Sequence, residues 1–252
     1  MGKDIQPLLD GWPYDPGKLC VRKIKGADGR EKIQLRIEMG ILQMEMTGRP
    51  DGQRPHGYES LLAYYQAQAA SKSGKNDEYS VDVETCMMLQ LEALQYYHRR
   101  ISFLELEDYE RAKKDAERNL DLFDFVKEYA SDEEDKLAFE QNRPFVIGHR
   151  VRASALLKLE TDDYDGALVD IEEGIDEIQS LFTEFDRLDL MEDSEEVEFL
   201  REWADEIKQD RPRSLKQDLS DQLKEAVALE DFEKAAEIRD RIHAMAKAGK
   251  NF

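Results

Sequence analysis

One short pattern occurs three times in this chain and constrains its fold more than any other feature: Asp, an aromatic residue, two spacers and Ala. The copies are Asp108-Tyr109-Glu110-Arg111-Ala112, Asp163-Tyr164-Asp165-Gly166-Ala167 and Asp231-Phe232-Glu233-Lys234-Ala235. Each copy follows a run of helix-forming residues and precedes another. The Asp can cap the second helix, the aromatic ring can pack back on the first, and the Ala lets the two helices approach closely. The pattern therefore predicts three tight helical hairpins, which are usual in proteins that bind other proteins.

The chain is acidic, and its charge is unevenly distributed. Its 252 residues suffice for one large domain or two small ones, and a charged content of 37% suits long helices with solvated outer faces. The formal net charge of the chain is −21. Residues 1–56 hold 10 Lys and Arg against 8 Asp and Glu, a net charge of +2. The remaining residues hold 26 Lys and Arg against 49 Asp and Glu, a net charge of −23. Phosphate binding needs a cationic surface, so this balance argues against direct contact with nucleic acid.

The two cysteines, Cys20 and Cys86, lie far apart and form neither a disulfide framework nor a zinc cluster. The first residues lack the apolar stretch of a signal peptide, and nowhere do 18 apolar residues follow one another. We expect a cytoplasmic protein that makes no contact with a membrane.

Residues 1–57 have the pattern of a small β module. After an irregular lead-in over 1–18, Gly26 to Gly29 supply a turn, and Ile33, Leu35, Ile37 and Met39 alternate with polar residues. Gly40 interrupts the alternation, and residues 41–46 either continue the strand past a bulge or form a third one. We expect an antiparallel sheet with one apolar face, followed by a stiff Pro- and Gly-rich loop.

Residues 58–210 are helical in pattern and resemble tetratricopeptide repeats (TPRs). Tyr109 with Ala112 and Ala116, and Tyr164 with Ala155 and Ala167, fall where that motif places aromatic and small residues. Two departures argue against a regular array. The two tyrosines are 55 residues apart rather than the usual 34 or so, and Arg100 stands where the first copy should have a small residue. The resemblance implies TPR-like hairpins rather than a proper repeat array.

Residues 213–247 resemble the UVR motif shared by UvrB and UvrC. The marks are Leu and Ala on a first helix, Glu230-Asp231-Phe232-Glu233 at a turn, Ala235-Ala236, and then Ile238-Arg239-Asp240 and Ile242. The resemblance implies a helical hairpin that mediates association between proteins. The expected partner-binding residues are Leu215, Leu219, Leu223, Val227, Phe232, Ala235, Ala236, Ile238, Arg239 and Ile242. A hairpin of this length falls below the size of roughly 40 residues that usually folds unaided, so its apolar stripe should dock on something.

The sequence offers no reactive constellation. The four histidines have no ligand at metal spacing, and neither a nucleophile elbow nor a Gly-rich phosphate loop is present. We therefore expect no catalytic, cofactor or metal site. One loop carries a weaker hypothesis: Arg49, Asp51, Arg54 and His56 are held among Pro and Gly residues and could recognise an acidic or phosphate group of a partner. The simpler alternative is a turn that joins the sheet to the first helix.

The predicted fold is thus mainly α: TPR-like helical hairpins and a C-terminal UVR hairpin, preceded by a small antiparallel β-sheet. The predicted function is that of a non-enzymatic adaptor whose partner is a protein, either another UVR-motif protein or a second copy in a homodimer. The alternative is an accessory factor of nucleotide excision repair that acts through UvrB- or UvrC-type partners.

Overall fold

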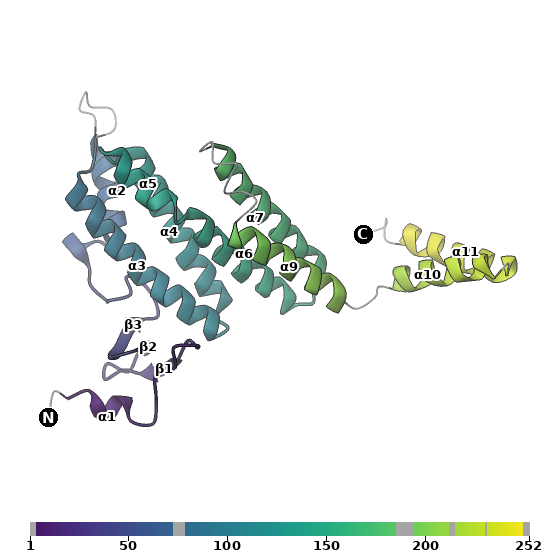
Figure 1. The fold of residues 1–252 in the computed structure, drawn as a ribbon, viewed down its shortest axis with the longest axis horizontal. Helices are drawn as coiled ribbons and strands as arrows, with labels where there is room; N and C mark the ends of the chain where they lie inside the picture. The colour runs from purple at the N-terminus through teal and green to yellow at the C-terminus, as the bar shows by residue number, and fades with distance from the viewer. Residues whose placement is uncertain (1–3, 73–78, 185–193, 212–214, 230, 249–252) are drawn as a thin grey trace. The chain divides into compact units, whose positions relative to one another are not determined.

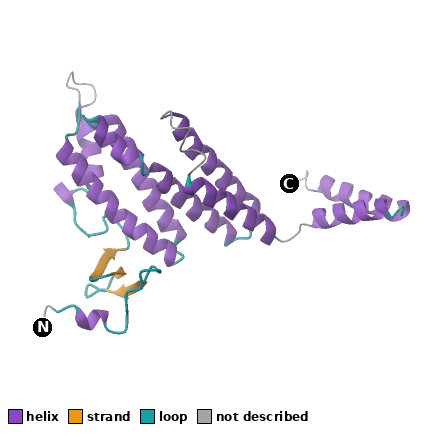
Figure 2. Ribbon diagram, in the orientation of Figure 1, coloured by secondary structure: helices purple, strands orange, loops and turns teal. Residues whose placement is uncertain are grey.

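The computed structural model describes residues 4–72, 79–184, 194–211, 215–229 and 231–248 (Figure 1). The chain forms two compact units, Met1–Asp205 and Glu206–Phe252, with the boundary inside a helix. Helices dominate, as predicted, and the strands are confined to the N-terminal region (Figure 2). None of the described helices is long and apolar enough to cross a membrane.

The elements follow one another in a simple order. The N-terminal region contains α1 (Gln6–Leu9), β1 (Val21–Lys25), β2 (Glu31–Ile37), β3 (Gly40–Glu45) and the 3-10 helix η1 (Pro55–Gly57). The helices that follow are α2 (Leu61–Lys72), α3 (Val83–Glu105), α4 (Tyr109–Tyr129), α5 (Glu133–Glu140), α6 (Arg143–Leu159), α7 (Tyr164–Glu184), α9 (Glu195–Asp210), α10 (Leu215–Ala228) and α11 (Phe232–Ala248).

The sheet is an antiparallel meander in the order β1-β2-β3. The predicted turn between β1 and β2 forms, with Gly29 at a φ of 78° that glycine tolerates without strain. Ile37 pairs with Gly40, so β3 is a third strand and Glu38 and Met39 form the turn between them. Our placement of Met39 on the apolar face is therefore wrong: as a turn residue it is 87% exposed.

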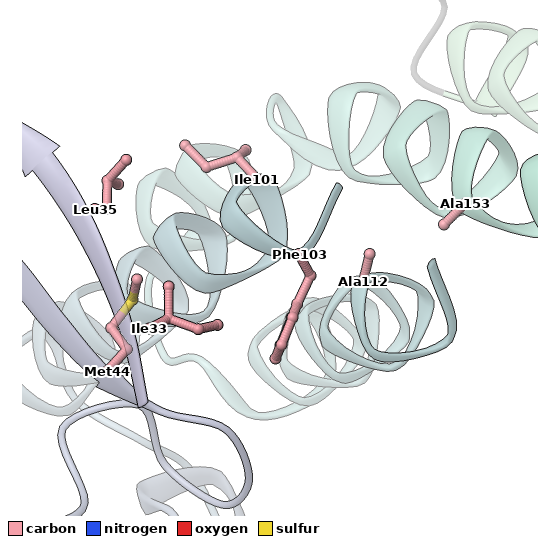
Figure 3. Close-up of a cluster of buried hydrophobic side chains, with 7 residues drawn as sticks. All are labelled: Ile33, Leu35, Met44, Ile101, Phe103, Ala112 and Ala153. Atoms are coloured by element: carbon pink, nitrogen blue, oxygen red, sulfur yellow. The ribbon is translucent and has the colours of Figure 1, made fainter. Parts of the chain in front are cut away.

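The apolar face of the sheet packs against the helices (Figure 3). Ile33 and Leu35 of β2 and Met44 of β3 are buried in one cluster with helical side chains. Its helical members are Ile101 and Phe103 of α3, Ala112 of α4 and Ala153 of α6. Burying each large apolar side chain contributes about 1.5–3 kcal/mol, so this cluster holds the small sheet on the helices.

Two helical hairpins form the body of the first unit. α3 packs against α4, α6 packs against α7, and the hairpins meet through α4 and α6. The short helix α5 lies between the hairpins in the sequence and also contacts α4. The 55-residue spacing of Tyr109 and Tyr164 accommodates this inserted helix together with the long α4 and α6.

The three copies of the repeated pattern form turns with the same backbone hydrogen bonds. In each, the N–H of the Asp donates to the carbonyl five residues earlier, and the N–H of the Ala donates to the Asp carbonyl. The first bond is 2.9 Å long in all three turns: Asp108 to Phe103, Asp163 to Lys158 and Asp231 to Ala226. This bond closes the end of the preceding helix in the manner of a Schellman motif. The three Ala side chains, at 112, 167 and 235, are buried as predicted.

The Asp side chains differ from one copy to the next. Asp163 and Asp231 accept from the N–H groups of Gly166 and Lys234, at 3.0 and 3.1 Å, and so cap their helices as predicted. Asp108 makes no such capping bond. Its carboxylate lies 2.6 Å from the guanidinium of Arg111 instead, so an ion pair has replaced the cap at this turn.

Candidate interaction surface

The C-terminal hairpin has a small core of its own. Leu219 and Ala226 of α10 and Ala235 and Ile238 of α11 are buried against one another, and Leu223 packs beside them. Two of these four buried side chains are alanines, which remove little apolar surface from water. Among the hairpin residues whose side chains the structure describes, the interior therefore removes little apolar surface from water.

Three large apolar side chains at the connecting turn are exposed. Val227 near the end of α10, Leu229 in the turn and Phe232 at the start of α11 are 51%, 73% and 68% exposed. We call these three residues the turn patch. Three exposed large apolar side chains within six residues of one turn are a candidate association surface.

The predicted partner-binding residues of this hairpin thus fall into groups. Leu219, Leu223, Ala235 and Ile238 belong to the interior of the hairpin, and Ala236 is partly buried. Val227 and Phe232 belong to the turn patch, and Arg239 is exposed with its guanidinium 3.0 Å from Asp240. Leu215 and Ile242 lie on α10 and α11, but their side chains are outside the described residues.

The aromatic residue of the repeated pattern has different surroundings in the two units. Tyr109 is partly buried and packs on the cluster between the sheet and the helices. Phe232 occupies the same place in its own turn and is exposed, so the expectation that each aromatic packs back on the preceding helix is wrong for this copy. Leu229 also belongs to the turn patch but was not among the predicted partner-binding residues. Its position directly before the acidic turn could have indicated it.

The loop after the sheet is built into the interior through Arg49. The Nε atom of Arg49 lies 3.3 Å from Oε2 of Glu92, which is a fully buried residue of α3. Arg99, also on α3, donates to the carbonyl oxygens of Glu45 and Gly48 at 3.0 and 2.8 Å. These contacts support the reading of this segment as a joint between the sheet and the helices.

The other predicted residues of the loop lie nearer the surface. The Asp51 carboxylate accepts from the N–H of Gln53 at 2.9 Å and lies 3.4 Å from the guanidinium of Arg49. The His56 ring stacks on Tyr64 of α2, with 4.1 Å between centroids. Arg54 is exposed and donates weakly to the Gly57 carbonyl. Of the four, Arg54 keeps a guanidinium that could reach a partner.

The Cys86 thiol and the His149 ring have strongly shifted pKa values that suit a structural role. Burial raises the pKa of the Cys86 thiol to about 12, which keeps it protonated. Burial and the neighbouring Arg100 lower the pKa of His149 to about 3, so its ring is neutral and accepts from Nε of Arg100 at 3.1 Å. Within the described ranges, no group of three or more His, Cys, Asp or Glu side chains could hold a metal ion.

The comparison with protein families supplies one match. A family model described as the UvrB/uvrC motif matches residues 213–247. Neither the comparison with curated proteins nor that with solved structures gave a match. The matched segment contains α10 and α11 with the turn patch between them. The C-terminal hairpin of this chain is therefore a UVR motif, the motif named for UvrB and UvrC.

Proposed function

We propose that the protein is a non-enzymatic, cytoplasmic adaptor that associates with another protein through its UVR hairpin. The observation that carries this proposal is the turn patch, in which Val227, Leu229 and Phe232 lie exposed. Burying such side chains contributes about 1.5–3 kcal/mol each, so association that covers them would be favourable.

The helical body supports the same proposal. The hairpins α3–α4 and α6–α7 contact each other through α4 and α6, a stacking that suits TPR-like scaffolds. We infer that this body is the scaffold of the adaptor and that the UVR hairpin is its docking element. The structural roles of Cys86 and His149 fit a protein that acts by binding rather than by chemistry.

The test is to make the turn patch polar without touching the hairpin interior. In the full chain, Val227, Leu229 and Phe232 are each replaced by Ser. A matched control replaces Leu8, Leu137 and Val169 by Ser, because these side chains are similarly exposed but lie on three separate helices. Light scattering measures the mass over a range of concentrations, and affinity capture with quantitative mass spectrometry compares bound proteins.

The two readouts separate the possible partners. Loss of concentration-dependent mass in the turn-patch variant alone indicates a homodimer, and loss of a captured protein alone indicates a different partner. If the turn-patch variant and the wild type have the same mass and the same bound proteins, association does not depend on this surface and the proposal fails.

The second candidate, an accessory factor of nucleotide excision repair, is favoured by the family match itself. In this version the hairpin associates with a UvrB- or UvrC-type protein. The net charge of −21 argues that any contact with DNA would be made by the partner. A deletion strain with normal survival after ultraviolet irradiation would count against this candidate and leave the general adaptor proposal standing.

A further inference from the structure

Arg100 of α3 is a buried cation that forms no direct ion pair among the described residues. The Asp115 carboxylate acts on it at longer range, and its guanidinium carbon lies 5.6 and 6.0 Å from the ring centroids of Tyr97 and Phe145. The whole of Arg100 is 1% exposed, and its Nη1 atom has no hydrogen-bond acceptor within the protein. Nε donates to Nδ1 of His149 at 3.1 Å, which is a neutral contact. These contacts compensate a buried charge less than a direct ion pair does, so an arginine held in this way calls for an explanation.

Two other buried arginines, Arg99 and Arg143, differ from Arg100 because each is hydrogen-bonded to a carboxylate. Arg99 is equally buried and forms two hydrogen bonds with the Asp115 carboxylate, at 2.7 and 2.8 Å. Arg143 does the same with Glu140, at 2.8 and 2.5 Å. In a chain with 57 acidic residues, the structure describes no ion pair for Arg100. It also stands where the TPR-like pattern would place a small residue.

Arg100 lines a cavity of about 250 Å³ formed by α3, α4, α5 and α6. The other walls are mostly apolar and aromatic: Leu94, Tyr97, Phe123, Phe139, Phe145 and Val146. Leu94 and Phe145 are also exposed, so the cavity opens to solvent beside them. Ligand pockets are typically about 300–1,000 Å³, so this one suits a ligand with a single ring or a short branched chain.

We propose that this cavity binds a small monocarboxylate with an aromatic or branched apolar body, whose carboxylate pairs with the guanidinium of Arg100 after a small side-chain shift exposes Nη1, which is shielded from solvent in the unliganded protein. The apolar walls would bury the body, and the guanidinium would neutralise the charge. A neutral ligand would leave the cation without a direct ion pair, whereas a phosphate dianion would leave a negative charge in excess. Burial lowers the pKa of Arg100 to about 10, so the guanidinium remains charged at neutral pH.

The first experiment compares an acid with its amide. Phenylacetate and phenylacetamide are titrated into the full chain at millimolar concentration, with binding followed by ligand-observed NMR; 4-methylpentanoate and its amide test the branched body. The proposal predicts that each acid binds at least about tenfold more tightly than its amide. Equal binding of acid and amide, or no binding of either acid, overturns it.

The second experiment fills the cavity. Ala138 of α5 is a half-buried lining residue, and Ala138→Leu would occupy the space without altering Arg100. Ala67→Leu on α2 is the matched control, because Ala67 is also a half-buried helical alanine and lies outside the cavity lining. We expect Ala138→Leu to weaken acid binding at least about tenfold and Ala67→Leu to leave it unchanged. Unchanged binding to folded Ala138→Leu places the ligand elsewhere and overturns the proposal.

A third variant tests the cation. Arg100→Gln keeps a polar side chain next to His149 but removes the charge, and its folding is checked by circular dichroism before any titration. The preference for acid over amide should disappear in this variant. If Arg100→Gln does not fold, Arg100→Lys keeps the charge, and the acid should retain its advantage over the amide in that variant. A preference for the acid that persists in folded Arg100→Gln contradicts the assignment of the carboxylate to Arg100.

Discussion

The guanidinium of Arg49, in the loop after the sheet, is paired with the fully buried carboxylate of Glu92 on α3, with 3.3 Å between Nε and Oε2. The same carboxylate accepts from the backbone N–H groups of Leu61 and Leu62 at 2.8 and 3.1 Å, and it also bonds to Arg118 of α4. Glu92 thereby caps α2 and ties the loop to two further helices. The segment that resembled a recognition loop is in part a structural joint.

This arrangement predicts that Arg49→Ala destabilises the protein by about 1–2 kcal/mol, because the buried Glu92 carboxylate loses one cation but keeps Arg118 and two backbone N–H donors. Arg54→Ala is the matched control in the same loop, and we expect it to change the free energy of unfolding by less than about 0.5 kcal/mol. Urea unfolding of the three proteins measures both effects. Equal stability of Arg49→Ala and Arg54→Ala would show that the Glu92 carboxylate does not need Arg49. Because Arg54→Ala keeps the joint intact, its effect on partner capture also tests the recognition hypothesis.

His149 predicts a pH dependence of stability. Burial, with repulsion from Arg100, lowers the pKa of its ring from the usual 6.5 to about 3 in the folded protein. Between these values the unfolded chain binds a proton that the folded chain does not, so the free energy of unfolding decreases as the pH falls. The decrease from this residue is up to about 1.4 kcal/mol per pH unit, and above pH 6.5 or so it contributes none.

The variant His149→Gln isolates this contribution, because the glutamine oxygen can still accept from Arg100 but the side chain does not titrate. We expect its free energy of unfolding, measured in urea at several values between pH 7 and pH 5, to depend less steeply on pH than that of the wild type. His98, whose pKa is also lowered by burial, is present in both proteins and cancels in the comparison. Identical slopes would mean that His149 is protonated in the folded state.

The local pattern of the sequence predicts the helical hairpins well. Asp108, Asp163 and Asp231 each stand directly before a helix, and the Ala four residues later is buried in every copy. These features depend on residues within one turn of each other, which a sequence displays directly. Met39 shows where the local pattern fails, because alternation of apolar and polar residues continues unchanged through a two-residue turn.

Long-range pairing was not predictable from the sequence. Arg49 and Glu92 are far apart in the chain, and nothing in the spacing of either residue indicates the other. The burial of Arg100 and the exposure of Phe232 depend on which helices cover them. For the same reason, the resemblance to the UVR motif identified the hairpin but did not separate its interior residues from the turn patch.

The two cysteines should differ in reactivity. Cys86 is buried, and burial together with nearby carboxylates raises its pKa to about 12, so almost no thiolate is present at neutral pH. Cys20, near the start of β1, is partly exposed. We expect Ellman's reagent to modify Cys20 in the native protein and Cys86 only after unfolding. Rapid modification of native Cys20→Ser would contradict the burial of Cys86.

The packing of α6 on α7 predicts opposite effects for two glycine substitutions. A methyl group on Gly174 of α7 would lie 2.2 Å from Cγ2 of Val151, which is itself buried on α6. Alanine favours a helix over glycine by about 1 kcal/mol, but the overlap costs typically 1–3 kcal/mol, so Gly174→Ala should be destabilising on balance. Gly148 on α6 is the control: the closest atom to its added methyl group is 3.7 Å away, an ordinary contact, so Gly148→Ala should stabilise by up to about 1 kcal/mol.

A double-mutant cycle connects the first effect to its cause. If Val151 is the obstacle, Gly174→Ala should cost less in a Val151→Ala background than in the wild type, because the shortened side chain leaves room for the new methyl group. Urea unfolding of the single variants, the double variant and Gly148→Ala provides every value that is needed. Stabilisation by Gly174→Ala in the wild-type background, or a cost that Val151→Ala leaves unchanged, would show that α6 and α7 are not in such close contact.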